Sequence, residues 1–199
     1  MNINDLSHIQ LDALREVANI GSGNAATALS ILIGEKVDMS APNVNFTPME
    51  ELVGENAERH VVAVMVKVIG DIPGSTMYVF DKNVAVRLIE ALTGKREDEL
   101  TEFGLSAISE VGNIIAGSFI NAIASFTGVE AVASVPAVAE DMAGAILVSS
   151  FVENGQYDDK VLDIQTIFKG GLNSGIEGDF FYIPEPGSLN IILKSLGFN

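Results

Sequence analysis

Cysteine is absent from the 199-residue chain, and histidine occurs only twice, at His8 and His60. Without cysteine the protein has no disulfide, no thiolate nucleophile and no cysteine-based metal site. Two histidines far apart in sequence leave little material for a Ser-His-Asp triad or a histidine-ligated metal, and we expect each at the surface or an edge. Any chemistry must therefore use carboxylates, amides and hydroxyls, and no metal site is expected.

Basic residues are also scarce, since 11 Lys and Arg face 27 Asp and Glu and give a net charge of −16. Such a surface repels a phosphate backbone and an anionic lipid face, so neither nucleic acid nor membrane is an expected partner. No run of 18 apolar residues occurs, and residues 1–15 lack the basic start and apolar core of a secretory signal. We expect a cytoplasmic protein without membrane insertion.

Low-complexity tracts and long polar linkers are missing, and the six prolines stand singly along the chain. Apolar residues make up 48% of the sequence and charged residues 19%, as in an ordinary folded protein. A chain of this length can bury a real core. The composition predicts one domain over residues 1–199.

Two stretches with the composition of long helices carry glycine and asparagine in their interior: EVANIGSGNAATA at 16–28 and EVGNIIAGSFINA at 110–122. Both residue types are poor helix formers, and Gly costs about 1 kcal/mol relative to Ala. Several residues coincide when the second stretch is shifted back onto the first by 94 positions. They are Asp12 with Ser106, Glu16 with Glu110, Asn19 with Asn113, Gly23 with Gly117, and Pro42 with Pro136. This predicts an internal repeat, residues 1–94 and 100–199, with the charged loop 95–99 between them.

Local signals predict the elements of the first half. Ser7 with Gln10 forms a capping-box pattern for a helix that ends at Gly34, and Asp81 is expected to cap a helix that ends at Gly94. Alternating apolar residues predict strands. The expected order is a helix to 34, extended chain 36–46, a short helix 47–54, strands 60–70 and 74–80, and a helix 82–92.

The second half is expected to follow the same plan. Its predicted elements are a long helix 102–126, a strand 129–138, a helix 139–152, strands 161–169 and 178–183, and a last helix 187–196. The fold class is therefore α+β, with two similar halves (long helix, strand, short helix, two strands, helix) that share one sheet. The long helices are expected to be exposed on one face.

The repeated polar residues fall on one stripe of each long helix. At 100° per residue, and counting from Asp12, Glu16 lies at about 40°, Asn19 at about −20° and Gly23 at about 20°. Leu14, Val17, Gly21, Ala25 and Ala28 lie on the opposite side, and Ile108, Val111, Ile115 and Phe119 do so in the second helix. A glycine on the outward stripe lets another molecule approach closely. A carboxamide can hold a water and a phosphoryl oxygen together, and the carboxylate can pair with a cation of the partner.

A single Glu-x-x-Asn on an exposed helix is ordinarily a solvated surface, and glycine inside a helix more often serves helix packing, as we expect for Gly21 and Gly112. The repetition favours the functional interpretation. A duplicated fold can keep its core with many different surface residues, so the same outward Glu and Asn in both copies indicate a shared role.

The spacing of these residues resembles the motif of the CheC/CheX/FliY family of chemotaxis phosphatases: Asp or Ser, three residues, Glu, two residues, Asn, twenty-two residues, Pro. ANIGSGNAATALS and the turn DIPGS at 71–75 are also similar to CheC-type members. The resemblance covers essentially the whole chain. Two Glu/Asn pairs point to the CheC or FliY type. We expect the CheC type, because the 199-residue sequence has room for neither the C-terminal flagellar-switch domain nor the N-terminal regulator-binding tail of FliY.

The resemblance implies an enzyme, a phosphatase that hydrolyses the aspartyl phosphate of the response regulator CheY. Asn19 and Asn113 would orient the attacking water, and Glu16 and Glu110 would anchor the regulator's active-site lysine. The protein would need no cofactor of its own, because CheY would hold the Mg²⁺. The resemblance implies docking residues as well: Asp12, Gly23, Ser106 and Gly117.

The resemblance also implies a second partner, the receptor deamidase CheD, whose binding raises phosphatase activity. We expect its contact on the predicted helix at 139–151, which has no close counterpart in the first half, with Glu140 and Asp141 as exposed contact residues. The alternative function is a weakly catalytic or non-catalytic adaptor or decoy that binds CheD. Intact Glu and Asn in both halves favour the enzyme.

Overall fold

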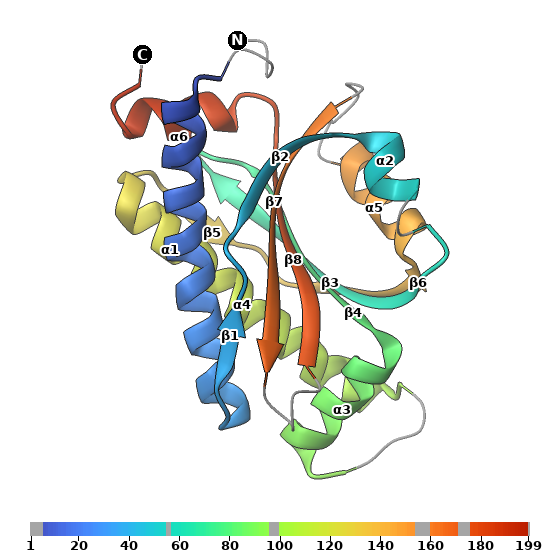
Figure 1. Cartoon of the computed structure of the whole chain (residues 1–199). Coiled ribbons are helices and arrows are strands. Elements are labelled where there is room, and N and C mark those ends of the chain that lie inside the picture. Colours follow the sequence, from blue (N-terminus) through green and yellow to red (C-terminus); the bar gives the residue numbers. More distant parts are fainter. Residues whose placement is uncertain (1–5, 55–56, 96–99, 154–159, 171–175, 199) are drawn as a thin grey trace.

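The computed structural model describes residues 6–54, 57–95, 100–153, 160–170 and 176–198. A central antiparallel sheet separates two groups of helices (Figure 1). The predicted boundary loop at 95–99 lies outside the described residues, apart from Lys95. The fold class predicted from the sequence, α+β with two similar halves around one sheet, is confirmed.

The first half begins with a 26-residue helix whose ends follow the predicted signals. The Ser7 side chain accepts a hydrogen bond from the Gln10 amide, the Gln10 side chain accepts one from the Ser7 amide, and Gly34 ends the helix at φ 70°. The elements in chain order are α1 (His8–Ile33), β1 (Val37–Met39), β2 (Asn43–Pro48), α2 (Met49–Gly54), β3 (His60–Gly70), β4 (Gly74–Asp81) and α3 (Lys82–Thr93).

The second half repeats this order. Its elements are α4 (Glu102–Thr127), β5 (Ala131–Ala133), β6 (Ala137–Met142), α5 (Ala143–Glu153), β7 (Lys160–Gly170), β8 (Ile176–Pro184) and α6 (Ser188–Ser195). From the long helix to the strand before the short helix, every boundary lies 94 residues after its counterpart in the first half. The short helix differs, because α5 has 11 residues and α2 has six.

The sheet reflects this duplication. Its strand order is β1-β7-β8-β4-β3-β5, with β2 also paired to β7 and β6 also paired to β3. The two central strands, β4 and β8, come from different halves, and each half sends its short strands to the edge of the other half. The halves therefore interlock and share one sheet, instead of forming two separate sheets.

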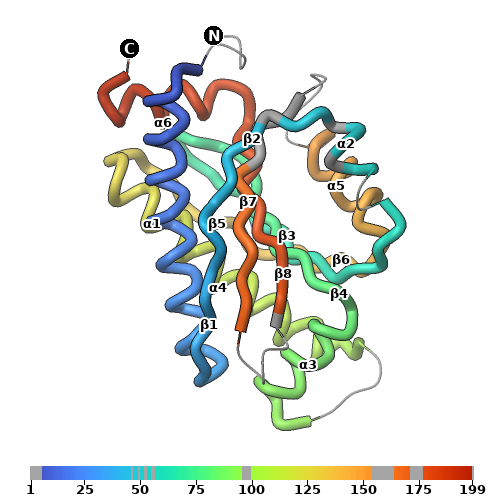
Figure 2. Tube along the Cα trace, in the orientation of Figure 1, coloured from blue at the N-terminus to red at the C-terminus, as the bar shows by residue number. Residues whose placement is uncertain are grey.

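The two faces of the sheet carry two apolar cores. The larger core lies between the sheet and the long helices α1 and α4, which pack against each other, and includes Phe119, Phe168 and Phe180. The smaller core lies between the opposite face and α5, and includes Phe151 and Phe181. Helix α6 lies beside the start of α1 at one end of the molecule (Figure 2). The long helices thus form one face of the molecule, and α2 and α5 lie on the other.

Helix α4 is long and apolar enough to cross a membrane by length and composition. Its apolar side faces the core in this fold, where Ile108, Val111, Ile115 and Phe119 are fully buried. Packing against α1 and the sheet therefore accounts for the hydrophobicity of α4.

The predicted boundaries differ from the structure in one region. The expected strand 129–138 is two short strands, β5 and β6, separated by a break that contains Pro136. The expected helix 139–152 begins only at Ala143, because residues 137–142 pair with β3 from His60 to Met65. Tertiary pairing outweighs the helix propensity of Ala139 and Glu140 at this point.

Candidate functional site

The outward stripe of α1 is exposed as the periodicity predicts. Asp12, Glu16 and Asn19 are exposed and Gly23 is half-buried, while Leu14 and Val17 on the opposite side are buried. Glu16 and Asn19 lie three residues apart and are therefore neighbours on the helix surface. A carboxylate and an amide thus lie side by side, free of the core.

The stripe of α4 has the same order. Ser106 and Glu110 are exposed, and Asn113 and Gly117 are half-buried. Each long helix therefore presents one Glu/Asn pair followed by a glycine one turn further on. The two pairs come from different helices and form two separate candidate sites.

The glycines of the two quoted stretches, Gly21, Gly23, Gly112 and Gly117, fall into two classes. A Cβ atom added at Gly117 would meet nothing within 4 Å, and one at Gly23 would approach only Met39 Cε, at 3.9 Å. A Cβ at Gly21 would lie 2.6 Å from the Phe119 ring, and one at Gly112 would lie 2.3 Å from Val64 Cγ1. Gly21 and Gly112 therefore serve packing, while the stripe glycines leave open space beside each Asn.

The chemistry available at each stripe is that of an amide and a carboxylate. An amide offers a donor and an acceptor to a water or a phosphoryl oxygen, and a carboxylate accepts from a cation. Among the described residues, no group of three or more His, Asp or Glu side chains could hold a metal ion.

The two stripes differ in charge. Arg15 Nη1 lies 3.0 Å from Asp12 Oδ1 on α1, and both side chains are exposed. Ser106 and Ser109 occupy the corresponding positions of α4, which contains no Lys or Arg. An open groove also runs along the C-terminal half of α1 beside β1, from Gly23 to Met39. The sites are therefore similar in chemistry but unequal in their surroundings.

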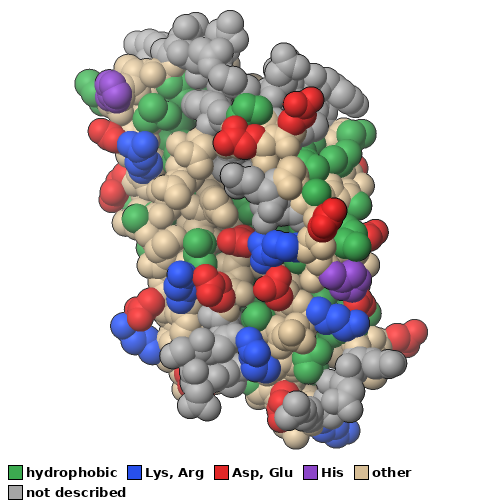
Figure 3. Space-filling view, turned by 45° about the vertical axis from the view of Figure 1, so that its right-hand side comes forward, with side chains coloured by type: hydrophobic (Ala, Val, Ile, Leu, Met, Phe, Trp, Pro, Cys, Tyr) green, Lys and Arg blue, Asp and Glu red, His purple; other side chains and the backbone are tan. Residues whose placement is uncertain are grey.

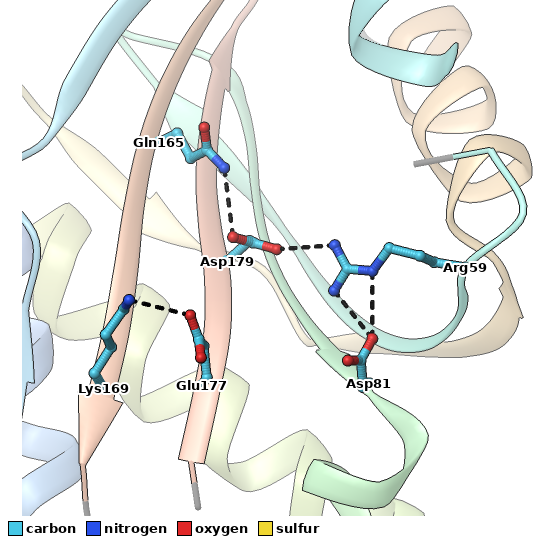
Figure 4. Close-up of polar contacts among 6 residues, drawn as sticks. All are labelled: Arg59, Asp81, Gln165, Lys169, Glu177 and Asp179. Carbon is cyan, nitrogen blue, oxygen red and sulfur yellow. Dashed lines mark hydrogen bonds and ion pairs between the residues drawn. The ribbon is translucent and has the colours of Figure 1, made fainter. Parts of the chain in front are cut away.

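A second polar cluster, which local sequence patterns did not predict, lies on the other side of the sheet (Figure 4). Arg59 binds Asp81 at 3.0 Å and Asp179 at 3.4 Å, and Gln165 donates to Asp179 at 3.4 Å. Figure 3 shows acidic and basic side chains mixed across the middle of this face. The cluster ties the segment before β3 to the end of β4 and to β8, so we interpret it as structural.

The capping role expected for Asp81 is only partly correct. Asp81 is the N-cap residue of α3, but its side chain makes no capping hydrogen bond and pairs with Arg59 instead. The hydrogen bonds and charges of Asp81 and Asp179 raise the pKa of Arg59 against the opposing effect of burial. The guanidinium therefore stays charged at every physiological pH.

Two tyrosines are buried in the larger core, and their hydroxyls have raised pKa values. Burial raises the pKa of Tyr78 and of Tyr182 far above the ordinary value. The Tyr78 hydroxyl has no hydrogen-bond partner among the described residues, and the Tyr182 hydroxyl donates to the Ile72 carbonyl at 3.2 Å. Both hydroxyls are closed to solvent and stay protonated, so neither offers a nucleophile.

Glu140 and Asp141 are not on a helix, contrary to the prediction, but on the edge strand β6. Glu140 Oε1 lies 2.8 Å from Lys82 Nζ and 3.9 Å from His60 Nδ1, so its side chain is engaged. Asp141 Oδ1 accepts from the Met142 amide. Both histidines, His8 and His60, are exposed as expected.

Comparisons with known proteins agree with this architecture. The CheC-like family model matches residues 9–46, and the model of the chemotaxis phosphatase CheX matches residues 62–154. The chain is 31% identical over 202 residues to the CheY-P phosphatase CheC of Bacillus subtilis, and the match covers 98% of this chain and 97% of that protein.

Solved structures extend the likeness to the fold. The crystal structure of Thermotoga maritima FliY superposes with a TM-score of 0.77 at 21% identity and covers 97% of this chain and 98% of its own. A CheX–CheY–BeF3–Mg²⁺ complex from Borrelia burgdorferi gives a TM-score of 0.60 at 16% identity and covers 88% and 99%. The extent and identity of the match to CheC show that this chain belongs to the CheC-like family of chemotaxis phosphatases.

Proposed function

We propose that the protein hydrolyses the aspartyl phosphate of a CheY response regulator, at two sites formed by Glu16 with Asn19 and by Glu110 with Asn113. The observation that carries the proposal is the presence of the same exposed Glu/Asn pair on both long helices. The names of the relatives support the substrate, because CheC is a CheY-P phosphatase and a CheX has been crystallised with CheY. We keep the cytoplasm as the expected location.

The mechanism requires little chemistry from this chain. An acyl phosphate is already reactive, so the catalyst mainly has to hold a water in line with the phosphorus atom. Asn19 and Asn113 would orient that water, because an amide can accept from the water and donate to a phosphoryl oxygen. The Mg²⁺ would be held by the regulator.

Phosphate release is the direct test. Phosphorylated CheY should lose its phosphate faster with this protein than alone, whereas a free acyl phosphate such as acetyl phosphate should show little acceleration. Equal acceleration of both substrates would contradict docking to the regulator. No acceleration of either substrate would exclude the enzyme.

Replacing Glu16 and Glu110 by Gln is expected to raise the KM for phosphorylated CheY about tenfold, with a smaller effect on kcat. The physical reason is that the carboxylate paired with the regulator's lysine contributes to docking, while Gln keeps only a neutral acceptor. A charged hydrogen bond contributes about 1.5–3 kcal/mol and a neutral one about 0.5–1.5 kcal/mol, and a difference of about 1.4 kcal/mol corresponds to tenfold. The measurement is initial rate against regulator concentration. A carboxylate acting as general base would instead lower kcat and remove a pH dependence, with KM unchanged.

Binding of CheD is the second candidate function, and the exposed side of α5 favours it. Ala145, Val148 and Val152 are exposed on this helix, whose one charged residue, Glu153 at its last position, pairs with Lys67 at 3.2 Å. Helix α2, the counterpart of α5, is shorter, so among the described residues it offers no surface of the same length. An asymmetric apolar surface suits a partner that binds once, either to stimulate the phosphatase or to be sequestered by it.

Replacing Val148 and Val152 by Asp is therefore expected to weaken CheD binding at least tenfold and to leave unstimulated phosphatase activity intact. Burial of two aliphatic side chains contributes to affinity, and two charges at the same place oppose it. Calorimetry with CheD measures the effect, and Ile191→Asp on α6 is a control at another exposed apolar residue. Unchanged affinity would place the CheD contact elsewhere.

Charge reversal at Glu140 and Asp141 tests CheD binding less cleanly than the sequence suggested. Reversing the charge of Glu140 would break its pairing with Lys82. A change in CheD affinity could then report a local rearrangement of β6. Asp141→Lys remains the useful variant, because within the described part of the chain the Asp141 carboxylate accepts a hydrogen bond only from the neighbouring Met142 amide.

A further inference from the structure

Each long helix begins with a large apolar residue exposed to solvent. Ile9 in the first turn of α1 is 70% exposed, and Phe103 in the first turn of α4 is 59% exposed. The two positions are 94 residues apart, so they are equivalent in the repeat. Neither side chain belongs to either apolar core.

The two residues lie on the same stripe as the candidate sites. The stripe of α1 runs Ile9, Asp12, Glu16, Asn19, Gly23, with successive steps of three, four, three and four residues. At 100° per residue, Ile9 falls at about 60° from Asp12, close to Glu16 at about 40°. The stripe of α4 has the same steps from Phe103 to Gly117. This spacing gives a nearly straight seam along one helix face.

Single exposed apolar residues are ordinary, so the repetition is what needs a cause. Ile31 and Phe126 are also exposed on the long helices, but their counterparts are Ser125 and the half-buried Leu32. Among the described residues, Ile9 and Phe103 are the one pair of large exposed apolar side chains that lie 94 positions apart, at equivalent positions of the two repeats. The side chain differs in shape between the copies, but its apolar character and its exposure are retained.

We infer that Ile9 and Phe103 are apolar anchors by which the phosphorylated regulator docks, one at each site; this inference rests on the proposed function. The anchor begins the stripe, the Glu/Asn pair follows, and the glycine ends it. The regulator would therefore cover about four helical turns along the stripe, and it would bury Ile9 or Phe103 against an apolar part of its own surface. The two residues are positioning residues and take no part in the chemistry.

Charge explains why an apolar anchor is useful here. The chain carries a net charge of −16, and α4 offers no cation to attract a phosphorylated partner. Burial of apolar surface supplies affinity that does not depend on charge and that salt does not screen. Arg15 on α1 has no counterpart on α4, where Ser109 stands at the equivalent position, so the site on α4 is expected to depend more strongly on its anchor.

The test uses variants in which one site at a time remains. With Asn113→Ala, which leaves the α1 site, Ile9→Ser is expected to raise the KM for phosphorylated CheY about tenfold while kcat stays constant. With Asn19→Ala, which leaves the α4 site, Phe103→Ser should do the same and Ile9→Ser should have no effect. Ile9→Leu and Phe103→Leu should leave the KM close to that of the respective single-site parent, because leucine retains an apolar side chain of similar volume.

Phe126→Ser is the matched control for Phe103. It lies on the same helix, is 50% exposed, and falls at about 200° from Ser106, on the side away from the stripe. The KM of the Phe126→Ser variant for phosphorylated CheY should equal that of its parent. The anchoring role would be contradicted if the KM did not change in either serine variant, or if Ile9→Ser had an equal effect in both single-site proteins. The proposed function would stand in both cases. Absence of turnover in every single-site parent would overturn the proposed function itself.

Discussion

Replacing Asn19 and Asn113 together by alanine is expected to abolish stimulated dephosphorylation, a loss of about 100-fold or more, and to leave the fold intact. An attacking water that is no longer held in line loses the advantage of orientation, and misplacement by about 1 Å can cost about 10² in rate. Neither amide is buried in the core, so unfolding free energy should change by less than about 0.5 kcal/mol. Phosphate release and thermal unfolding measure the two quantities.

Each single variant should retain part of the activity, because the two sites lie on different helices. Asn24→Ala serves as a control on α1, since Asn24 is exposed but its side chain donates to the Ile20 carbonyl at 2.9 Å. It lies outside the stripe at about 120° from Asp12. Acceleration by the double variant equal to that of the unmodified protein would contradict the water-orienting role.

Gly112→Ala and Gly117→Ala are expected to have opposite effects on stability, although they are five residues apart on the same helix. The new methyl at 112 would lie 2.3 Å from Val64 Cγ1 and 2.5 Å from Val64 Cβ, so the core must shift. Overpacking of this kind costs about 1–3 kcal/mol. The methyl at 117 would meet nothing within 4 Å and would gain about 1 kcal/mol of helix propensity.

Activity is expected to change in the opposite sense to stability at Gly117. Gly117→Ala, and more strongly Gly117→Leu, is expected to lower phosphate release at the α4 site, because the side chain fills space that the regulator would occupy. The measurement requires Asn19→Ala in the same protein, so that only the α4 site contributes. A Gly117→Leu protein that is stable and fully active would show that the glycine does not serve close approach. An unchanged melting temperature for Gly112→Ala would contradict its packing role.

Local chemistry in the sequence was sufficient for most helix and strand boundaries. The capping box of Ser7 and Gln10 begins α1. Gly34, Gly94 and Gly128, each with φ near 70°, end α1, α3 and α4. The outward stripes also followed from the sequence, because helical periodicity alone determines which side chains share a face. Duplication made the candidate residues recognisable.

Tertiary structure decided what depends on residues far apart in sequence. Residues 137–142 form strand β6 because β3 offers them a partner, and no local signal contains that information. Asp81 pairs with Arg59 instead of capping α3, and Ser22 on α1 shares a buried hydrogen bond of 2.9 Å with Thr166 on β7. The stripes were set by residues within a few helical turns, whereas these contacts join residues that are at least 22 positions apart in sequence.

The helix glycines show the same division most clearly. The sequence alone assigned Gly21 and Gly112 to the buried side and Gly23 and Gly117 to the outward side, since the 3.6-residue period of a helix determines toward which side each position points. It did not specify that Gly21 faces the Phe119 ring of the other long helix while Gly112 faces Val64 of the sheet. Direction is a property of one helix, but the contact depends on how two halves of the chain interlock through their exchanged edge strands.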